Sequence, residues 1–324
     1  MVDDAQLARS RSIQRRTGKT FHLATRLLPP RARRSTYVLY AFFRIADEVF
    51  DAEETPPPAE QRERLHEVRD AALGRVETDD PVLAAFSEVR EEAGIADEDV
   101  EVFVDAMLSD VDTDRYEEYA ELEAYMNGSA SAVGRMMTAM MDPDDPERAL
   151  PHATTLGEAF QMTNFVRDVH EDIVERDRIY LPMETFRDHG VTEDQLLNFE
   201  FDDDVAAAVR TELERTERLY GEGVAGIEYL PEDCQFAVLL SAVLYADHHR
   251  LVRSRGYDTL TETPSLSTPR KLWLVARTRA HWALNKDAEA VFHRVAAVET
   301  DGDGDADSSY RSRARRLLGR LPVP

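Results

Sequence analysis

The segment YVLYAFFRIADEVFD, residues 37–51, decides the fold. Its apolar residues recur at three- and four-residue spacing, which is the pattern of an amphipathic helix. Arg44, Asp47 and Asp51 fall on one face of that helix, with the two carboxylates one turn apart. A solvated acidic cluster has no reason to follow aromatic residues such as Tyr40 and Phe43. We therefore predict a helix that turns a charged face into the interior of the protein.

A second segment, FQMTNFVRDVHED at residues 160–172, has the same design. Gln161, Asn164, Asp168 and Asp172 recur at i, i+3, i+7 and i+11, which makes one polar stripe on a largely apolar helix. Arg167 adjoins the first of the two aspartates. A polar stripe on an apolar helix predicts a buried polar cavity, because buried polar groups need partners.

The two segments together predict a metal site. If they face each other across a helical bundle, their four aspartates can hold Mg²⁺, which prefers a few carboxylates, waters and the phosphate oxygens of a substrate. The alternative for each segment alone is an internal ion pair, Arg44–Asp47 or Arg167–Asp168. The pair Asp110/Asp114 has the same spacing but lies in a polar stretch, so we expect it at the solvated surface.

The rest of the chain predicts an all-α protein. Strand-like alternation is absent, and prolines separate the helical segments. We expect one large helical domain over residues 1–299, an acidic linker over 300–309 and an arginine-rich tail over 310–324. For the tail, a short helix packed on the body and a contact with an anionic membrane are both open. The expected helices cover residues 34–52, 59–75, 98–109, 121–141, 155–175, 204–227, 233–254 and 269–295.

The charge of the chain limits its function. Asp and Glu number 64 against 39 Lys and Arg, a net charge of −25, which excludes a nonspecific nucleic-acid binder. Only Lys19, Lys271 and Lys286 are lysines, and an acidic, lysine-poor composition resembles the proteins of halophilic archaea. Cys234 is the single cysteine, expected as buried filler, so no intrachain disulfide forms and a reducing cytoplasm is the expected compartment. No signal peptide or membrane span is evident, which predicts a soluble or peripheral protein.

Several motifs resemble the squalene/phytoene synthase family, in the order that the family has them and over roughly residues 17–290. The N-terminal motif is Lys19-Thr20-Phe21 and LATRLLPP, followed by YVLYAFFRIADEVFD. The second aspartate-rich motif is QMTNFVRDVHED with RIYLP at residues 178–182. The middle and C-terminal patterns are Tyr116, Leu122, Tyr125, SASAVG at 129–134, Tyr245, GYD at 256–258 and STPRKL at 267–272.

The resemblance implies a single-domain class I isoprenoid synthase, a helical bundle around a central cavity. It implies that two allylic diphosphates condense head-to-head through a cyclopropylcarbinyl diphosphate, with Mg²⁺, or Mn²⁺ as the alternative. No dinucleotide-binding loop such as G-x-G-x-x-G is evident, and we expect no nicotinamide cofactor. The roles it implies are these: Asp47, Asp51, Asp168 and Asp172 bind metal; Tyr40, Arg44 and Tyr245 join them as catalytic residues; Lys19, Thr20, Phe21, Arg44, Gln161, Asn164, Arg167, Arg178 and Tyr180 contact the substrate.

The sequence departs from the family pattern at a few positions. His170 and Asp177 stand where relatives usually have glycine, and the spacing from Asp172 to RIYLP is one residue longer than usual. Glu262 stands where relatives often have arginine, and Thr17 replaces a histidine seen in some of them. We expect His170 to be a solvated surface residue.

The preferred substrate is twenty-carbon geranylgeranyl diphosphate, which makes the expected activity phytoene synthesis for carotenoids. Squalene or dehydrosqualene synthesis from fifteen-carbon farnesyl diphosphate is the alternative. A class I terpene cyclase, a head-to-tail prenyltransferase and a non-catalytic assembly factor are less favoured, because the expected motifs of the first two are missing and all four aspartates are present. A peripheral membrane contact for product release is a further expectation.

Overall fold

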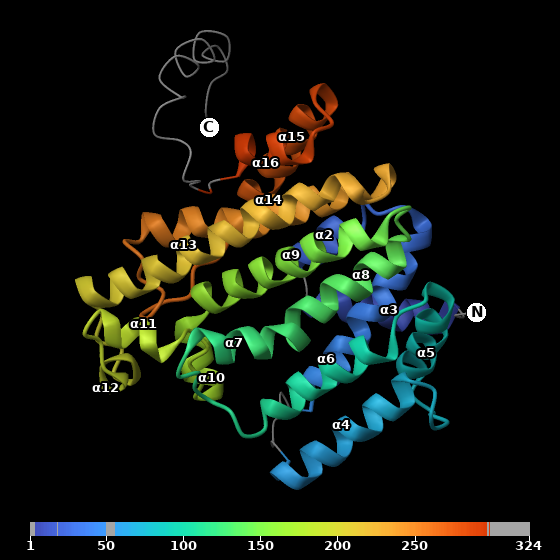
Figure 1. Cartoon of the computed structure of the whole chain (residues 1–324), viewed down its shortest axis with the longest axis horizontal. Helices are drawn as coiled ribbons and strands as arrows, with labels where there is room; N and C mark the ends of the chain where they lie inside the picture. The colour runs from blue at the N-terminus through green and yellow to red at the C-terminus, as the bar shows by residue number, and fades with distance from the viewer. Residues whose placement is uncertain (1–3, 18, 50–55, 297, 299–324) are drawn as a thin grey trace.

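The computed structural model describes residues 4–17, 19–49, 56–296 and 298, and within them every regular element is helical. The only β-type pairing in these residues is an isolated bridge between Arg115 and Ile179. The expectation of an all-α fold is confirmed. The elements, labelled in Figure 1, are α1 (Asp4–Thr17), α2 (Lys19–Thr25), α3 (Pro30–Asp47), α4 (Pro58–Ala72), α5 (Pro81–Ala93), α6 (Asp97–Ser109), α7 (Tyr119–Met126), the π-helical η1 (Asn127–Ser131), α8 (Ala132–Met141), α9 (Pro146–Arg167), α10 (Val169–Arg176), α11 (Met183–Asp188), α12 (Glu193–Leu197), α13 (Asp203–Ala225), the 3₁₀ turn η2 (Gly226–Tyr229), α14 (Glu232–Ser254), α15 (Thr268–Leu284) and α16 (Ala288–Val295).

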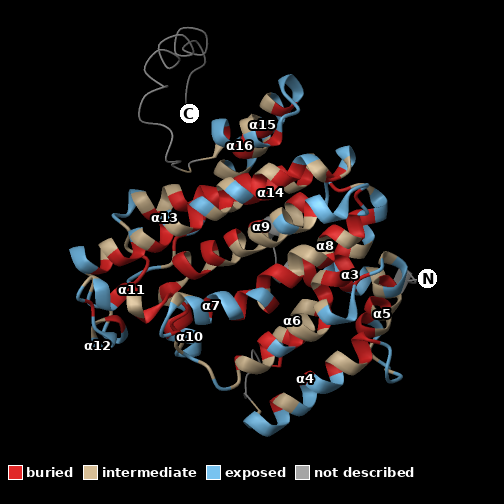
Figure 2. Ribbon diagram, viewed as in Figure 1, coloured by how far each residue is buried: buried red, intermediate tan, exposed pale blue. Residues whose placement is uncertain are grey.

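Three long helices, α9, α13 and α14, run side by side through the molecule (Figure 1). The helices α3, α6 and α8 lie on one side of this group, and α15 and α16 pack on the outside of α14. Figure 2 shows that buried residues run along most of α14, whereas α12 is largely exposed and α4 alternates between buried and exposed residues. The helix α9 is therefore the central element, in contact with neighbours on several sides.

Local sequence explains where several helices begin. Asp80, Asp145, Asp202 and Ser267 each accept a hydrogen bond from a backbone N–H in the first turn of the helix that follows. These side chains satisfy donors that would otherwise have no partner at a helix start. Proline stands at the first turn of α3, α4, α5, α9 and α15, where its missing N–H costs nothing.

Two of the expected helices are broken. The helix expected over 155–175 starts earlier, at Pro146, and leaves helical geometry at Asp168 before α10 continues. The helix expected over 269–295 stops at Leu284, and α16 begins anew after Asp287, whose carboxylate caps it. The expected helices also missed α1, α2, α5, α11 and α12 altogether.

The helix expected over 121–141 contains a π-helical segment, η1, between α7 and α8. A π segment holds one residue more per turn than the surrounding helix and often marks a functional region. Gly128 lies in this segment against α6, where a Cβ atom would stand 2.2 Å from the carbonyl oxygen of Val102. The glycine thus lets η1 lie directly on the backbone of α6.

Gly134 lets α8 approach α9, and its replacement gives a test of the packing. A Cβ atom at Gly134 would lie 2.3 Å from the backbone oxygen of Ala153. We expect Gly134→Ala to lower the free energy of unfolding by about 1–3 kcal/mol, because the two helices must separate. Urea titration followed by circular dichroism measures the change. The matched control is Gly221→Ala in α13, where nothing lies within 4 Å, and it should raise stability by roughly 0.5–1 kcal/mol; equal effects of the two changes would contradict the close packing.

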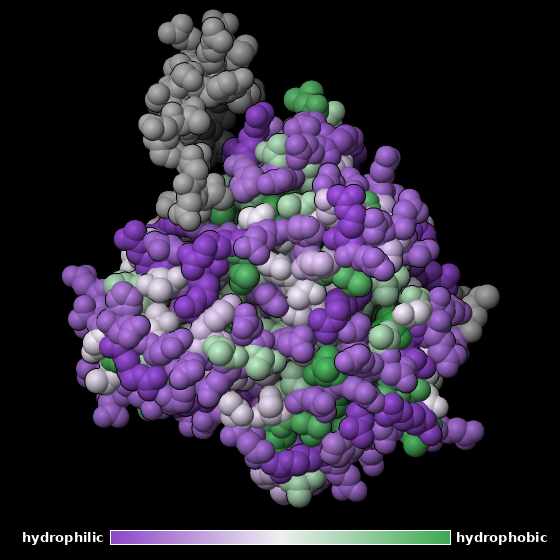
Figure 3. All heavy atoms as spheres, viewed as in Figure 1, coloured by the Kyte–Doolittle hydropathy of each residue, from purple (hydrophilic) through white to green (hydrophobic). Residues whose placement is uncertain are grey.

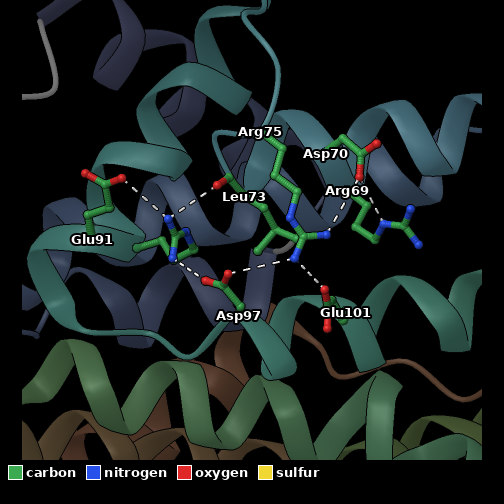
Figure 4. Close-up of polar contacts among 8 residues, drawn as sticks. Arg69, Asp70, Leu73, Arg75, Glu91, Asp97 and Glu101 are labelled. Carbon is green, nitrogen blue, oxygen red and sulfur yellow. Dashed lines mark hydrogen bonds and ion pairs between the residues drawn. The ribbon is translucent and has the colours of Figure 1, made fainter.

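An ion-pair network ties α4, α5 and α6 together at one edge of the molecule (Figure 4). Arg75 donates to Glu101 at 2.6 Å and lies 3.9 Å from Asp97. Arg90 pairs with the same Asp97 and donates to the carbonyl of Leu73. Exposed pairs contribute about 0–1 kcal/mol each, so the network fixes the positions of the three helices more than it stabilises the fold.

Two further expectations concern the chain as a whole. Cys234 is fully buried, and burial raises the pKa of its thiol to about 12, which fits the expected filler role. No helix in the described ranges is long and apolar enough to cross a bilayer. The predicted linker at 300–309 and the tail at 310–324 lie outside the residues that the structure describes, so the domain division stays a prediction.

Candidate active site

A cavity of about 1450 Å³ opens between α3, α6, α8, α9 and α14. Its mouth is charged and its interior is apolar and aromatic. Eleven of the residues predicted from the sequence line it: Tyr40, Arg44, Asp47, Gln161, Asn164, Arg167, Asp168, Asp172, Arg178, Tyr180 and Tyr245.

The helix α3 supplies one wall. Tyr40, Arg44 and Asp47 recur at four- and three-residue spacing, so a single face of α3 carries all three into the cavity. Arg44 donates a hydrogen bond from Nη1 to Oδ2 of Asp47 at 3.0 Å. The ion pair that was the alternative interpretation of this segment is therefore present, and it lies at the cavity wall. Asp51 falls outside the described residues.

The junction of α9 and α10 supplies a second wall. Arg167 donates two hydrogen bonds to the carboxylate of Asp168, one of them from Nε to Oδ1 at 2.6 Å. One turn further on, Asp172 accepts a hydrogen bond from Arg176 at 2.9 Å. Burial, and then the charge of Asp168, raise the pKa of Asp172 to about 7. Two carboxylates thus oppose each other in a poorly solvated place, and a divalent cation would relieve that repulsion.

The described residues contain no group of three or more His, Cys, Asp or Glu that could hold a metal ion. Asp47, Asp168 and Asp172 therefore do not form one ligand group in the described chain, and the predicted four-aspartate site stays a prediction. Mg²⁺ needs only one or two carboxylates together with substrate phosphates. Ser129 Oγ and Arg178 Nε line the cavity, are buried, and have no hydrogen-bond partner within the described chain. Ligand oxygens would satisfy both, because buried polar atoms need partners. The donors present therefore fit a metal-bound anion.

Arg178 and Tyr180 reach the cavity because their segment is clamped to the loop before α7. The backbone N–H of Ile179 donates to Asp114 at 3.0 Å, and that of Met183 donates to Tyr116 at 2.8 Å. The preceding residue, Asp177, ends α10 with φ at 51°, in the left-handed region. Glycine suits that conformation best and Asp tolerates it, so the Asp in place of a glycine keeps the same turn.

Asp110 corrects one expectation from the sequence. It was expected at the solvated surface, yet it is 8% exposed and lines the cavity. Its carboxylate lies 3.0 Å from Nη1 of Arg178 and accepts a hydrogen bond from the hydroxyl of Tyr125 at 3.0 Å. Burial raises the pKa of Asp110 to about 6, although Arg178 and Tyr125 both act to lower it.

The hydroxyls around Asp110 stay protonated at neutral pH. Burial raises the pKa of Tyr180 to about 12 and that of Tyr125 well above its usual value. Tyr180 stacks on Phe165 at 4.2 Å between ring centroids and accepts a hydrogen bond from Arg178 at 2.9 Å. The cluster therefore offers neutral aromatic faces beside a fixed guanidinium.

The third wall comes from α14. Tyr245 stacks on Phe160 at 4.7 Å between ring centroids, and its carbonyl contacts Nδ1 of His248 at 3.0 Å. Burial, and then the charge of Arg167, lower the pKa of His248 to about 3. His248 is therefore neutral at physiological pH and adds no charge to this wall.

An apolar extension of about 110 Å³ continues the cavity between α2, α8, α9 and α14. Val133, Met137, Gly157 and Phe160 line both spaces, so the two adjoin. The other lining residues are almost all apolar or small, among them Ala24, Leu28, Ala153, Leu156, Ala237 and Val238. The extension lengthens the apolar interior on the side away from the charged mouth.

The sequence missed four residues of this site: Asp110, Tyr125, Ser129 and His248. Tyr125 and Ser129 stood in quoted motifs, but nothing in the sequence showed that they face the cavity. The backbones of Lys19, Thr20 and Phe21 lie in α2, and their side chains are outside what the structure describes. The roles of all the predicted residues remain predictions.

His170 is another correction. It was expected as a solvated residue, but it is partly buried, with Nδ1 at 2.8 Å from the carbonyl oxygen of Leu260. Its ring packs on Phe199 at 5.0 Å between centroids. It therefore fastens α10 to the loop before α15.

The family model for squalene/phytoene synthases matches residues 14–272. The chain belongs to the squalene/phytoene synthase family. Its all-α fold is the helical isoprenoid synthase fold, and the chain is an isoprenoid synthase. The aspartates, arginines and tyrosines that line the cavity all lie within the matched range.

Individual members of the family resemble the chain over most of its length. A phytoene synthase of Rhodobacter capsulatus is 32% identical over 286 residues, which cover 86% of this chain and 82% of that protein. A phytoene synthase of Cereibacter sphaeroides is 32% identical over 98% of this chain and 91% of that protein. A crystal structure of a dehydrosqualene synthase with bound ligand is 28% identical, has a TM-score of 0.77, and covers 87% of this chain and 98% of its own.

Proposed function

We propose that this squalene/phytoene synthase is a phytoene synthase. It condenses two geranylgeranyl diphosphates head-to-head, through prephytoene diphosphate, to phytoene, and releases both diphosphates. The observation that carries the proposal is a charged mouth of paired aspartates and arginines leading into an apolar, aromatic interior. Relatives that are 32% identical over most of the chain are phytoene synthases, which favours the twenty-carbon substrate.

The charged mouth binds the diphosphate end of the substrate. Asp47, with Asp51, on α3 and Asp168 and Asp172 at the junction of α9 and α10 would hold magnesium through one or two carboxylates at a time, together with the diphosphate oxygens. Bound there, magnesium would supply positive charge that stabilises the leaving oxygens. Arg178 has a buried Nε without a partner in the described residues, and it donates to the diphosphate. Gln161 and Asn164 lie on the polar stripe of α9 that also carries Asp168, and they orient the substrate from that wall of the cavity.

The aromatic interior protects the allylic cation. Tyr40, Phe43 and Tyr245 line the cavity beyond the mouth, and their faces attract a cation by up to about 2 kcal/mol each when water is excluded. Tyr180 contributes a neutral face as well, because burial keeps its hydroxyl protonated. An apolar wall also keeps water from capturing the cation before the new carbon–carbon bond forms.

The proposal is tested by supplying the substrates. The purified chain is incubated with geranylgeranyl or farnesyl diphosphate and Mg²⁺, with and without NADPH, at low and at molar salt. The expected product is phytoene from the twenty-carbon substrate, formed without NADPH. We expect the highest rate at high salt, because salt screens the repulsion between a chain of net charge −25 and its anionic substrate. Hydrocarbon made only from farnesyl diphosphate would overturn the proposal.

The second candidate is squalene or dehydrosqualene synthesis from farnesyl diphosphate. The likeness to a dehydrosqualene synthase structure favours it, at a TM-score of 0.77. The same incubation separates the two, since the products differ by ten carbons. Squalene, which is reduced, would form only when NADPH is present.

The apolar extension gives a test of substrate length. Ala237 on α14 is buried and lines the extension. We expect Ala237→Phe to fill that space and to lower kcat/KM for the twenty-carbon substrate at least about tenfold more than for the fifteen-carbon substrate, since the loss of space for a few methylenes costs about 1–3 kcal/mol. The ratio of the two kcat/KM values in one variant corrects for any loss of folded protein. An unchanged ratio would show that the prenyl chain does not enter the extension.

A further inference from the structure

The helix α15 carries an apolar face into solvent. Leu272 is 60% exposed, Trp273 44% and Leu284 89%, which makes them three of the seven large apolar side chains that are exposed in the described chain. Ala276, Ala280 and Ala283 are exposed on the same helix. At 100° per residue, all six lie within one sector of the helix. Figure 3 shows a hydrophobic group at the outer end of α15, at the top of an otherwise mainly hydrophilic face.

The exposed face is fixed in this orientation. Leu274, Thr278 and Trp282 bury the opposite face of α15 against the body. At its start, Arg270 pairs with the fully buried Asp247 of α14 at 2.6 Å. The helix therefore has no freedom to turn its exposed leucines inward.

Trp273 stands between two arginines. The guanidinium of Arg270 lies 4.3 Å from the centre of a Trp273 ring, and that of Arg277 lies 5.0 Å away. Such contacts hold an indole at the surface with cations on either side. Tryptophan flanked by cations is the arrangement found where proteins meet the headgroup region of a membrane.

The charge of this segment is opposite to that of the chain. From Thr263 to Lys286 the charged residues are Arg270, Lys271, Arg277, Arg279 and Lys286, and there is no Asp or Glu, whereas the whole chain has a net charge of −25. The cations of such a surface complement the anionic headgroups of a lipid layer, and its apolar side chains complement the acyl chains. The acidic surface of a second copy would match the charge, but outside α15 its exposed large apolar side chains in the described chain are four single residues, Leu27, Val76, Val174 and Leu197.

We propose that α15 is an interfacial helix, through which the protein lies on an anionic membrane surface with Leu272, Trp273 and Leu284 inserted among the lipid headgroups. The apolar face holds the protein to the lipid, and the flanking cations select anionic headgroups. Because α14 lies between α15 and the cavity, and lines the cavity with Tyr245 and His248, the lipid surface is one helix away from the site. The proposal concerns binding and stands apart from the substrate specificity.

Tryptophan fluorescence tests the proposal on the full chain. The protein has two tryptophans, so Trp282→Phe leaves Trp273 as the only reporter. Titration with phosphatidylglycerol vesicles at low salt should shift its emission to shorter wavelength, and bromine-labelled lipids should quench it. Phosphatidylcholine vesicles should do neither. An unchanged emission with phosphatidylglycerol would overturn the proposal.

Vesicle co-sedimentation identifies the surface. The double change Leu272→Ser and Leu284→Ser should weaken binding at least about tenfold, because each leucine loses apolar burial in the interface. Leu197→Ser, an exposed leucine on α12, is the matched control and should bind as the wild type does. Turnover in detergent should be the same in all three proteins, since none of these leucines lines the cavity.

Two results would assign the contact elsewhere. If changing the tail arginines, residues 311, 313, 315, 316 and 320, to glutamine abolishes binding while the double leucine variant binds normally, the tail is the membrane contact and the proposal is wrong. If the double leucine variant changes from dimer to monomer in light scattering while vesicle binding is unaltered, α15 is an interface between copies of this chain.

Discussion

Asp168→Asn should leave a folded protein whose kcat is at least about a thousandfold below that of the wild type. The change keeps the shape of the side chain and removes the negative charge at the junction of α9 and α10, where the proposed metal and diphosphate meet. The loss of one electrostatic contact at a reacting centre commonly lowers kcat by a factor of about 10²–10³. The loss of a metal ligand also weakens the binding of the metal, which lowers kcat further. Steady-state rates with geranylgeranyl diphosphate and Mg²⁺ measure the loss, and circular dichroism and thermal melting check the fold.

The matched control for this change is Glu171→Gln, on α10 and three residues away. Glu171 is exposed and does not line the cavity, so its kcat should stay within about threefold of the wild type. Wild-type turnover by Asp168→Asn would refute the assignment of this carboxylate to the metal. A melting temperature that fell equally in both variants would leave the comparison of their rates intact.

Asp110→Asn should lower kcat about a hundredfold with little change in KM. Asp110 does not face the reacting atoms in this proposal; it holds Arg178 at 3.0 Å and accepts from Tyr125, and we regard it as a positioning residue. A misplacement of about 1 Å in a group that positions the reaction costs about 10²-fold. Steady-state kinetics separate kcat from KM, and rates for Arg178→Lys would show whether the guanidinium or only its charge is needed.

The pH profile distinguishes positioning from a merely structural role. Burial raises the pKa of Asp110 to about 6, while Arg178, Tyr125 and Arg176 favour its charged form and Asp47 opposes it. As pH falls through 6 the carboxylate gains a proton and loses its attraction for Arg178, so wild-type kcat should fall on that side. In Asp110→Asn the part of that limb that comes from Asp110 should be absent, because nothing at this position titrates. Asp172, whose pKa burial raises to about 7, still titrates in both proteins and serves as the internal reference.

The matched control for Asp110 is Asp112→Asn, two residues along the chain. Asp112 pairs with Arg62 at the surface, and its loss should change kcat by less than about twofold. If both variants lost activity equally, the effect would come from the loop and not from the buried carboxylate.

The two aspartate pairs were predicted to lie in the interior because the residues next to them in the sequence are apolar. Asp110 was missed because the residues next to it are polar. Asp47 and Asp168 stand among aromatic and aliphatic residues, so their place on the wall of an interior cavity could be inferred from the neighbours. Asp110 stands in SDVDTDRYEEY, which is polar, and its burial depends on Arg178, 68 residues later in the chain. A contact over that distance leaves no local pattern.

The break between α9 and α10 at Asp168 could not be predicted from the sequence either. Residues 160–175 contain neither glycine nor proline, and their spacing predicts an uninterrupted helix. In the folded chain, the backbone N–H of His170 donates instead to the carbonyl of Thr259 at 3.0 Å. A loop almost ninety residues away thus takes a hydrogen bond that the helix would otherwise have made, and tertiary contact overrides local propensity.

The π segment at Asn127–Ser131 has a consequence for insertions and deletions in this family. Each residue turns an α-helix by about 100°, so deletion of one residue here would return the segment to regular pitch and rotate everything before it. Tyr125 would then swing away from Asp110 while α8 kept its place against α9. The extra residue in η1 thus determines how the side chain of Tyr125 is oriented toward the cavity. Deletion of one residue from η1 should abolish activity while the protein stays folded.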